Sequence, residues 1–242
     1  MDPSLPQPTH GRTFAHERQI RLADLDANGR VRLDALARLL QDVAIEDVQE
    51  TGWGTPDHLW FVRRILLHVE RPLLEDRTLG LVTWCSGVAT IAAGRRWSVV
   101  GDRGGRVEVD SVWIHLGPDQ RPARIGDFGV YAEAAGERVV STRLALPAPP
   151  AASQRRPWPL RTTDVDPHGH VNNAIHWQAV EDALAAAQID ARGPLRAWLD
   201  YREPLDFGDE LELAIHTGDP PLTVGLVAGE RVKAVARVEP EA

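Results

Sequence analysis

The sequence is short of sulfur and of lysine: Cys85 is its only cysteine and Lys233 its only lysine. A single cysteine excludes a disulfide within the chain. Together with the absence of an apolar signal segment near the N-terminus, this favours a cytoplasmic protein. No run of about 18 apolar residues occurs, so no membrane span is expected.

Positive charge is also in short supply, with a formal net charge of -8 and a pI of about 5.6. This balance argues against a nucleic-acid partner bound through overall basicity. Adjacent arginines do occur in three pairs, at 63–64, 95–96 and 155–156. These pairs are either solvated surface charge or local patches that could meet an acidic partner.

One short phrase, in contrast, is present twice. Residues 24–34 read Asp-Leu-Asp-Ala-Asn-Gly-Arg-Val-Arg-Leu-Asp, and residues 164–173 read Asp-Val-Asp-Pro-His-Gly-His-Val-Asn-Asn. The two aspartates, the glycine and the valine match. The second copy carries His168 and His170 where the first carries asparagine and arginine. The repeat therefore predicts a duplicated domain in which only one copy kept imidazoles beside its carboxylates.

The same order of elements follows each copy of the phrase. Apolar residues recur at three- and four-residue steps from Leu33 to Val48, and a second helix is predicted over 172–188. Strands are predicted at 14–23, 59–70, 79–85, 94–101, 106–116, 158–165, 196–203, 209–216, 221–228 and 231–238. One helix cannot bury its apolar stripe alone, whereas a curved antiparallel sheet wrapped around it can bury that stripe.

Three stretches resemble one known family. Residues 164–173 are similar to its Asp-x-Asp-x-Asn-x-His-Val-Asn-Asn run. Residues 59–84 carry Leu-Trp-Phe-Val-Arg-Arg, Glu-Arg-Pro and Thr-Trp, and residues 95–122 carry Arg-Arg-Trp, Ser-Val-Trp-Ile and Arg-Pro. In these stretches, whose order covers residues 14 to 238, the chain resembles the acyl-acyl-carrier-protein (acyl-ACP) thioesterases of plants and bacteria.

The resemblance implies an α+β fold of two tandem hotdog domains, each a curved antiparallel sheet wrapped around a long helix. The first domain, with a degenerate site, is expected at 14–145 and the catalytic domain at 158–242. A proline-rich linker at 146–157 would join them. Each half then substitutes for a dimer partner, so a monomer or a weak homodimer is expected.

The implied activity is hydrolysis of fatty acyl thioesters of acyl carrier protein, which releases free fatty acid. Acyl carrier protein is then the partner, and no cofactor or metal is implied. Two alternatives stay open, because one fold hosts several functions. One is an acyl-CoA thioesterase, and the other is a non-catalytic protein that binds acyl groups.

Asp166 and His170 are the first candidate catalytic residues. A histidine held by a carboxylate can take a proton from water, and the N–H groups at the start of a helix favour an oxyanion. We therefore expect Asn172 and Asn173, beside the start of the predicted helix, to contact substrate. In the alternative interpretation the aspartates cap the helix and His170 is a surface residue.

His168 is a departure from the family pattern, which has asparagine there and which implies an orienting role. Imidazole can donate one hydrogen bond as the amide does, but it also titrates. A metal site built from His168, His170 and His176 is the alternative, although this spacing matches no strong zinc signature.

Glu203 is the last catalytic candidate, by resemblance to an acidic residue on a strand after the helix. Ungapped alignment puts it one residue early, and strict alternation along a strand would then aim it at the wrong face. Glu203 therefore needs a bulge to serve; otherwise it is a surface ion-pair partner. Trp60 and Trp84 are expected to line an acyl tunnel, with plain core packing as the alternative.

Overall fold

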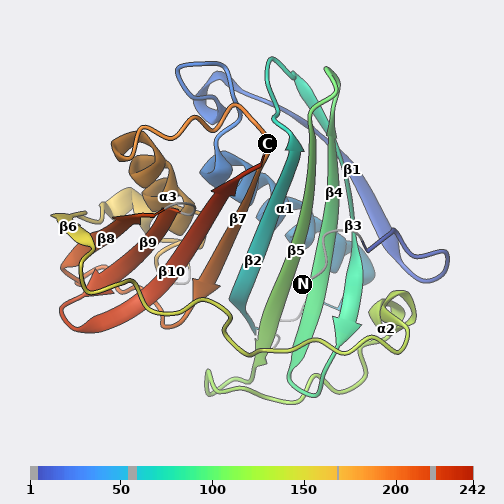
Figure 1. Ribbon diagram of the computed structural model, residues 1–242. Coiled ribbons are helices and arrows are strands. Elements are labelled where there is room, and N and C mark those ends of the chain that lie inside the picture. The colour runs from blue at the N-terminus through green and yellow to red at the C-terminus, as the bar shows by residue number, and fades with distance from the viewer. Residues whose placement is uncertain (1–4, 54–58, 168, 219–221, 242) are drawn as a thin grey trace.

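The computed structural model describes residues 5–53, 59–167, 169–218 and 222–241. Within them ten strands form one sheet in the order β1-β3-β4-β5-β2-β7-β10-β9-β8-β6 (Figure 1). The strands are β1 (Thr13–Gln19), β2 (Leu59–Arg71), β3 (Thr78–Val88), β4 (Ala92–Gly101), β5 (Arg106–Leu116), β6 (Gln154–Pro157), β7 (Leu195–Tyr201), β8 (Leu211–Thr217), β9 (Leu222–Ala228) and β10 (Arg231–Pro240).

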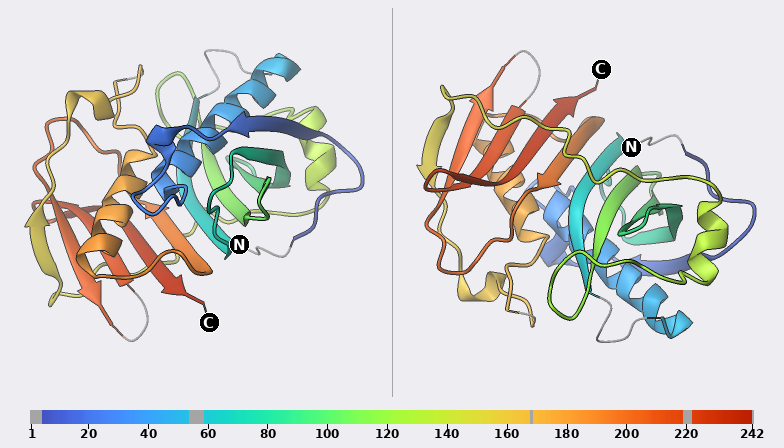
Figure 2. Two further views of the ribbon diagram at one scale, coloured as in Figure 1. Left: turned by 90° about the horizontal axis from the view of Figure 1, so that it is seen from above. Right: turned by 90° about the horizontal axis from the view of Figure 1, so that it is seen from below.

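Two long helices, α1 (Leu33–Thr51) and α3 (Ile175–Ala186), lie on one face of this sheet and contact each other (Figure 2). A short helix, α2 (Val130–Ala135), packs on β3. Among the described helices, none combines the length and the apolar character that crossing a membrane requires. The predicted α+β arrangement of two curved antiparallel sheets, each around a helix, is confirmed.

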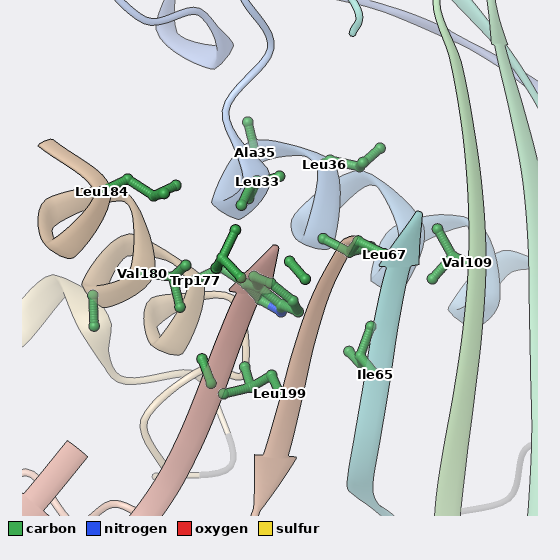
Figure 3. Close-up of a cluster of buried hydrophobic side chains, with 14 of the residues drawn as sticks. Leu33, Ala35, Leu36, Ile65, Leu67, Val109, Trp177, Val180, Leu184 and Leu199 are labelled. Carbon is green, nitrogen blue, oxygen red and sulfur yellow. The ribbon is translucent and has the colours of Figure 1, made fainter. Parts of the chain in front are cut away.

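The two halves join edge to edge where β2 pairs with β7 in antiparallel register. Apolar side chains from both helices and from these central strands form one continuous core, so the two halves share a single hydrophobic core. Figure 3 shows Trp177 of α3 among residues of both halves, including Leu33 of α1 and Leu199 of β7. Trp177 is fully buried, which ties α3 to the junction between the halves.

The start of the second half differs from the prediction. No strand covers 158–165; instead β6 at Gln154–Pro157 pairs with β8, and a 3-10 turn at Thr162–Asp164 follows. Pro157 and Pro159 lack the N–H that a strand would donate, which ends the pairing early. Part of the range predicted as a linker, 146–157, therefore belongs to the sheet.

The chain between α2 and β6, residues 136–153, crosses the outer face of the sheet, opposite the helices (Figure 1). Its backbone is anchored by side chains of the central strands. Asp200 of β7 accepts hydrogen bonds from the N–H groups of Ala145 and Leu146 at 2.7 and 2.8 Å. Arg63 of β2 donates to the carbonyl of Thr142 at 3.3 Å.

Gly225 in β9 allows the crossing segment to approach the sheet closely, because a Cβ there would lie 2.2 Å from Cγ of Pro149. We expect Gly225→Ala to destabilise the fold by about 1–3 kcal/mol through overpacking. Thermal unfolding would show this as a Tm lower by about 2–4 °C per kcal/mol. Gly208→Ala is the control, because nothing lies within 4 Å of its added Cβ. Adding Pro149→Ala to Gly225→Ala should restore part of the loss; no restoration would contradict the close approach as its cause.

Candidate active site

A cavity of about 850 Å³ runs from the sheet of the first half to the repeated phrase in the second half. Its apolar wall comes from α1, β2, β5, the residue Trp53 after α1, and the residues before and within α2: Ile45, Val48, Trp53, Trp60, Phe61, Trp113, Leu116, Phe128 and Tyr131. Its polar end is formed by Asp166, His170, Asn173, His176 and Glu203. A long apolar wall that ends in a few convergent polar groups is suited to a chain-like ligand with one reactive end.

The second copy of the phrase forms a tight turn that presents His170. The backbone N–H of His170 donates to Asp166 Oδ1 at 3.3 Å, so the carboxylate fixes the turn that carries the imidazole. Gly169 has a φ of 81°, a conformation that favours glycine. His170 is exposed and borders the cavity, so its ring is accessible both to water and to a ligand in the cavity.

The two asparagines at the start of α3 lie differently. Asn172 does not line the cavity; its Oδ1 accepts the N–H of Ala174 at 2.9 Å and so organises the first turn of the helix. Asn172 borders a smaller depression instead, and its contact with substrate stays a prediction. Asn173 does line the cavity, and within the described residues its backbone N–H has no acceptor.

Glu203 lines the cavity, and a bulge precedes it at the end of β7. The N–H groups of Arg202 and Glu203 both donate to the carbonyl of Lys233, at 2.9 and 3.0 Å. Two successive residues thus oppose one, which is the pattern of a bulge. The carboxylate of Glu203 is also paired with Arg231, so Glu203 both lines the cavity and forms an ion pair, and its catalytic role stays a prediction.

His176 and Tyr201 are cavity residues to which sequence reasoning gave no such role. His176 is 3% exposed, and burial lowers its pKa to about 4, although the carbonyls of Asn173 and Asn172 oppose the shift. Its ring lies 4.7 Å from the ring of Tyr201, whose hydroxyl donates to the Asn173 carbonyl at 3.2 Å. Burial raises the pKa of Tyr201, so both rings are neutral near pH 7.

The two tryptophans predicted to line a tunnel lie on opposite faces of the sheet. Trp60 lines the cavity, its ring 5.3 Å from that of His115 and 5.8 Å from that of Phe128. Trp84 is 2% exposed, packs under the guanidinium of Arg96 and does not line the cavity. Strand alternation puts Trp84 on the face away from α1, so it cannot contact a ligand there.

His168 lies outside the described residues. No group of three or more His, Cys, Asp or Glu side chains is placed to hold a metal ion in the described part of the chain. His170 is exposed on the turn, whereas His176 is buried in α3.

Comparison with known proteins agrees with this geometry. The model of the acyl-ACP thioesterase N-terminal domain matches residues 11–128, and that of the C-terminal domain matches residues 148–233. The chain belongs to the acyl-ACP thioesterase family. Thioester hydrolysis is accordingly its activity, and its predicted membership of this family is confirmed.

Relatives and solved structures extend the match over nearly the whole chain. An uncharacterized protein of Mycobacterium tuberculosis is 30% identical over 95% of this chain and 93% of its own length. Oleoyl-acyl carrier protein thioesterase 2 of Arabidopsis thaliana is 24% identical over 87% of this chain and 64% of its own. The acyl-ACP thioesterase of Bacteroides thetaiotaomicron superposes with a TM-score of 0.79 at 18% identity, covering 95% of this chain and 98% of that one. The 12:0-ACP thioesterase of Umbellularia californica superposes with a TM-score of 0.76 at 19% identity, covering 96% of this chain and 99% of that one.

The first copy of the phrase in this thioesterase keeps the backbone of the turn but has arginine at the position of the histidine. Asp26 Oδ1 accepts the N–H of Arg30 at 2.9 Å, as Asp166 does for His170, and Gly29 has a φ of 78°. Arg30, at the position of His170, is 6% exposed and binds Asp26 and Glu181. The matching site is therefore filled by an internal ion pair.

The cysteine and several of the paired arginines of this thioesterase lie inside the fold. The thiol of Cys85 is buried at the cavity wall, and burial raises its pKa, which makes it a poor nucleophile. Three of the six paired arginines are engaged within the fold: Arg64 binds Asp200, Arg95 binds Asp47 and Arg96 binds Glu108. Those three guanidinium groups are engaged internally and do not form a docking patch.

Proposed function

We propose that this thioesterase hydrolyses fatty acyl thioesters of acyl carrier protein and releases free fatty acid. The observation that carries the proposal is a cavity in which an apolar wall from the first half meets His170, Asp166 and Glu203 of the second. The apolar wall suits an acyl chain, and the polar end suits the thioester. The preference for the carrier protein is supported by the family and by the activity named for the Arabidopsis relative.

In the proposed reaction His170 is the general base. Its imidazole takes a proton from water as the water oxygen bonds to the thioester carbonyl carbon. The resulting oxyanion accepts a hydrogen bond from the Asn173 N–H at the start of α3, where the helix dipole favours negative charge. The intermediate then expels the thiolate, which recovers the proton from the imidazolium. Asp166 positions the turn, and Glu203, which borders the same cavity, is the assisting carboxylate.

All of these groups come from one chain, and the first half takes the place that a second subunit would fill. We therefore expect the monomer to be the active unit. One working turn and one filled turn also predict one active site per chain.

The experiment is a hydrolysis panel in which each acyl group, from short to long, is offered both on acyl carrier protein and on CoA. We expect kcat/KM to be at least about tenfold higher on the carrier protein, a difference of about 1.4 kcal/mol. Equal or higher kcat/KM on CoA would overturn the proposed preference in favour of an acyl-CoA thioesterase. Tight acyl binding without turnover would favour the non-catalytic alternative.

A further inference from the structure

The filled site in the first half shows what the start of such a helix binds. The backbone N–H of Leu33, at the start of α1, donates to Oε1 of Glu181 at 2.7 Å. Arg30 donates to the same carboxylate at 3.0 and 2.6 Å. A negatively charged oxygen from α3 therefore sits where the turn, the helix start and the position of the lost histidine converge.

The repeat identifies the equivalent position of each of these residues in the other half. Asp24 corresponds to Asp164, 140 positions later, and the turn bonds agree: Asp26 N donates to Arg30 O and Asp166 N donates to His170 O, both at 2.8 Å. By the same offset Arg30 corresponds to His170 and Leu33 to Asn173. Glu181 of α3 then corresponds to Gln41 of α1.

Gln41 lies where this correspondence requires. Its side chain lines the cavity together with His170 and Asn173, and it also borders a smaller depression beside Asn172. It is half-buried, and within the described residues its carboxamide makes no hydrogen bond. The Asn173 N–H has no acceptor in that part of the chain either. Gln41 and Asn173 thus both border the cavity, and no hydrogen bond joins the Gln41 carboxamide to the Asn173 N–H.

We propose that Gln41, supplied by the first half, is a catalytic residue of the second-half site. Its Nε2–H donates a hydrogen bond to the thioester oxygen that the Asn173 N–H also holds, and both bonds strengthen as that oxygen becomes negative. The Glu181 carboxylate at the filled site marks the corresponding position of the charged oxygen. Within the described residues no hydrogen bond joins Gln41 to the Asn173 N–H, which is therefore available to substrate, whereas the Glu181 carboxylate occupies the Leu33 N–H. This inference rests on the proposed function.

The kinetic test compares Gln41→Ala with Gln178→Ala. Gln178 is a half-buried glutamine of α3 that does not line the cavity, and its Nε2 donates to Asp34 Oδ2 at 3.5 Å. We expect Gln41→Ala to lower kcat about 100-fold with KM changed less than about threefold, the pattern for loss of an oxyanion donor. Gln178→Ala should leave both constants unchanged. Unchanged kcat in Gln41→Ala would overturn the inference.

Gln41→Glu adds a second test, a pH dependence of kcat that a purely structural role of residue 41 would not produce. Its ionised carboxylate cannot donate, whereas its protonated form can. The ratio of its kcat to that of the wild type should therefore rise as the pH is lowered through the range in which a glutamate protonates, near pH 4–5. A ratio that is flat with pH would overturn the donor role.

A stability cycle tests the contact without any substrate. Combining Gln41→Glu with His170→Arg should rebuild the Arg30–Glu181 pair on the working side. We expect the Tm of the double variant to lie about 3 °C or more above the value obtained by adding the two single changes in Tm to the wild-type Tm. Additive Tm values would overturn the inference. If the wild type hydrolyses no thioester while the Tm values couple, the proposed function fails and the contact between positions 41 and 170 is still established.

Discussion

Replacing His170 with alanine is expected to lower kcat about 1,000-fold, within the range of 10²- to 10⁴-fold that a general base contributes. His170 is the accessible imidazole at the polar end of the cavity, on a turn whose backbone is held by Asp166. The turn bond uses the backbone N–H of residue 170, which alanine keeps. The loss should therefore fall on the chemical step, with KM little changed.

The control for this prediction is His216→Ala in β8, a half-buried histidine that does not line the cavity. Its kcat should match that of the wild type. Because His170 is exposed, the free energy of unfolding of His170→Ala should lie within about 0.5 kcal/mol of the wild-type value. Retention of kcat within about threefold in His170→Ala would show that another group activates water, with Glu203 the next candidate.

Much of this fold can be predicted from the repeated phrase and from the periodicity of apolar residues. The apolar steps from Leu33 to Val48 predict α1 because only a helix places them on one face. The repeated turn is predictable from Asp-x-Asp followed by glycine, since each aspartate accepts a nearby backbone N–H in both copies. Local residues make these bonds, so local sequence is enough to predict them.

Features that depend on distant pairing could not be read in this way. The bulge before Glu203 at the end of β7 arises because two N–H groups share the carbonyl of Lys233, thirty residues away in β10. The placement of Trp84 depends on which face of β3 meets α1. The role of Gln41 depends on how α1 and α3 are packed, and no pattern around position 41 indicates it.

Removing the carboxylate of Asp200 is expected to cause the largest loss of stability in this chain. Asp200 is fully buried, and its Oδ1 accepts from Arg64 Nε at 2.6 Å. Its Oδ2 accepts the N–H groups of Ala145 and Leu146 in the crossing segment. One carboxylate thus joins β2 of the first half, β7 of the second and the connection between them. Asp200→Ala leaves a buried guanidinium and two N–H groups without this acceptor, at a cost of about 3–5 kcal/mol.

The two partners of this ion pair should not be equivalent, which separates its contribution from simple loss of packing. In Arg64→Met the Asp200 carboxylate keeps two backbone donors, so we expect a smaller loss than in Asp200→Ala. Arg64→Met/Asp200→Ala should be more stable than Asp200→Ala alone, because no unpaired charge stays buried. The control is Asp190→Ala, which breaks an exposed pair with Arg192 of similar length, 2.8 Å, and should leave the Tm unchanged. Chemical denaturation with each variant measures these differences, and equal losses in Arg64→Met and Asp200→Ala would show that the backbone bonds to the crossing segment contribute nothing.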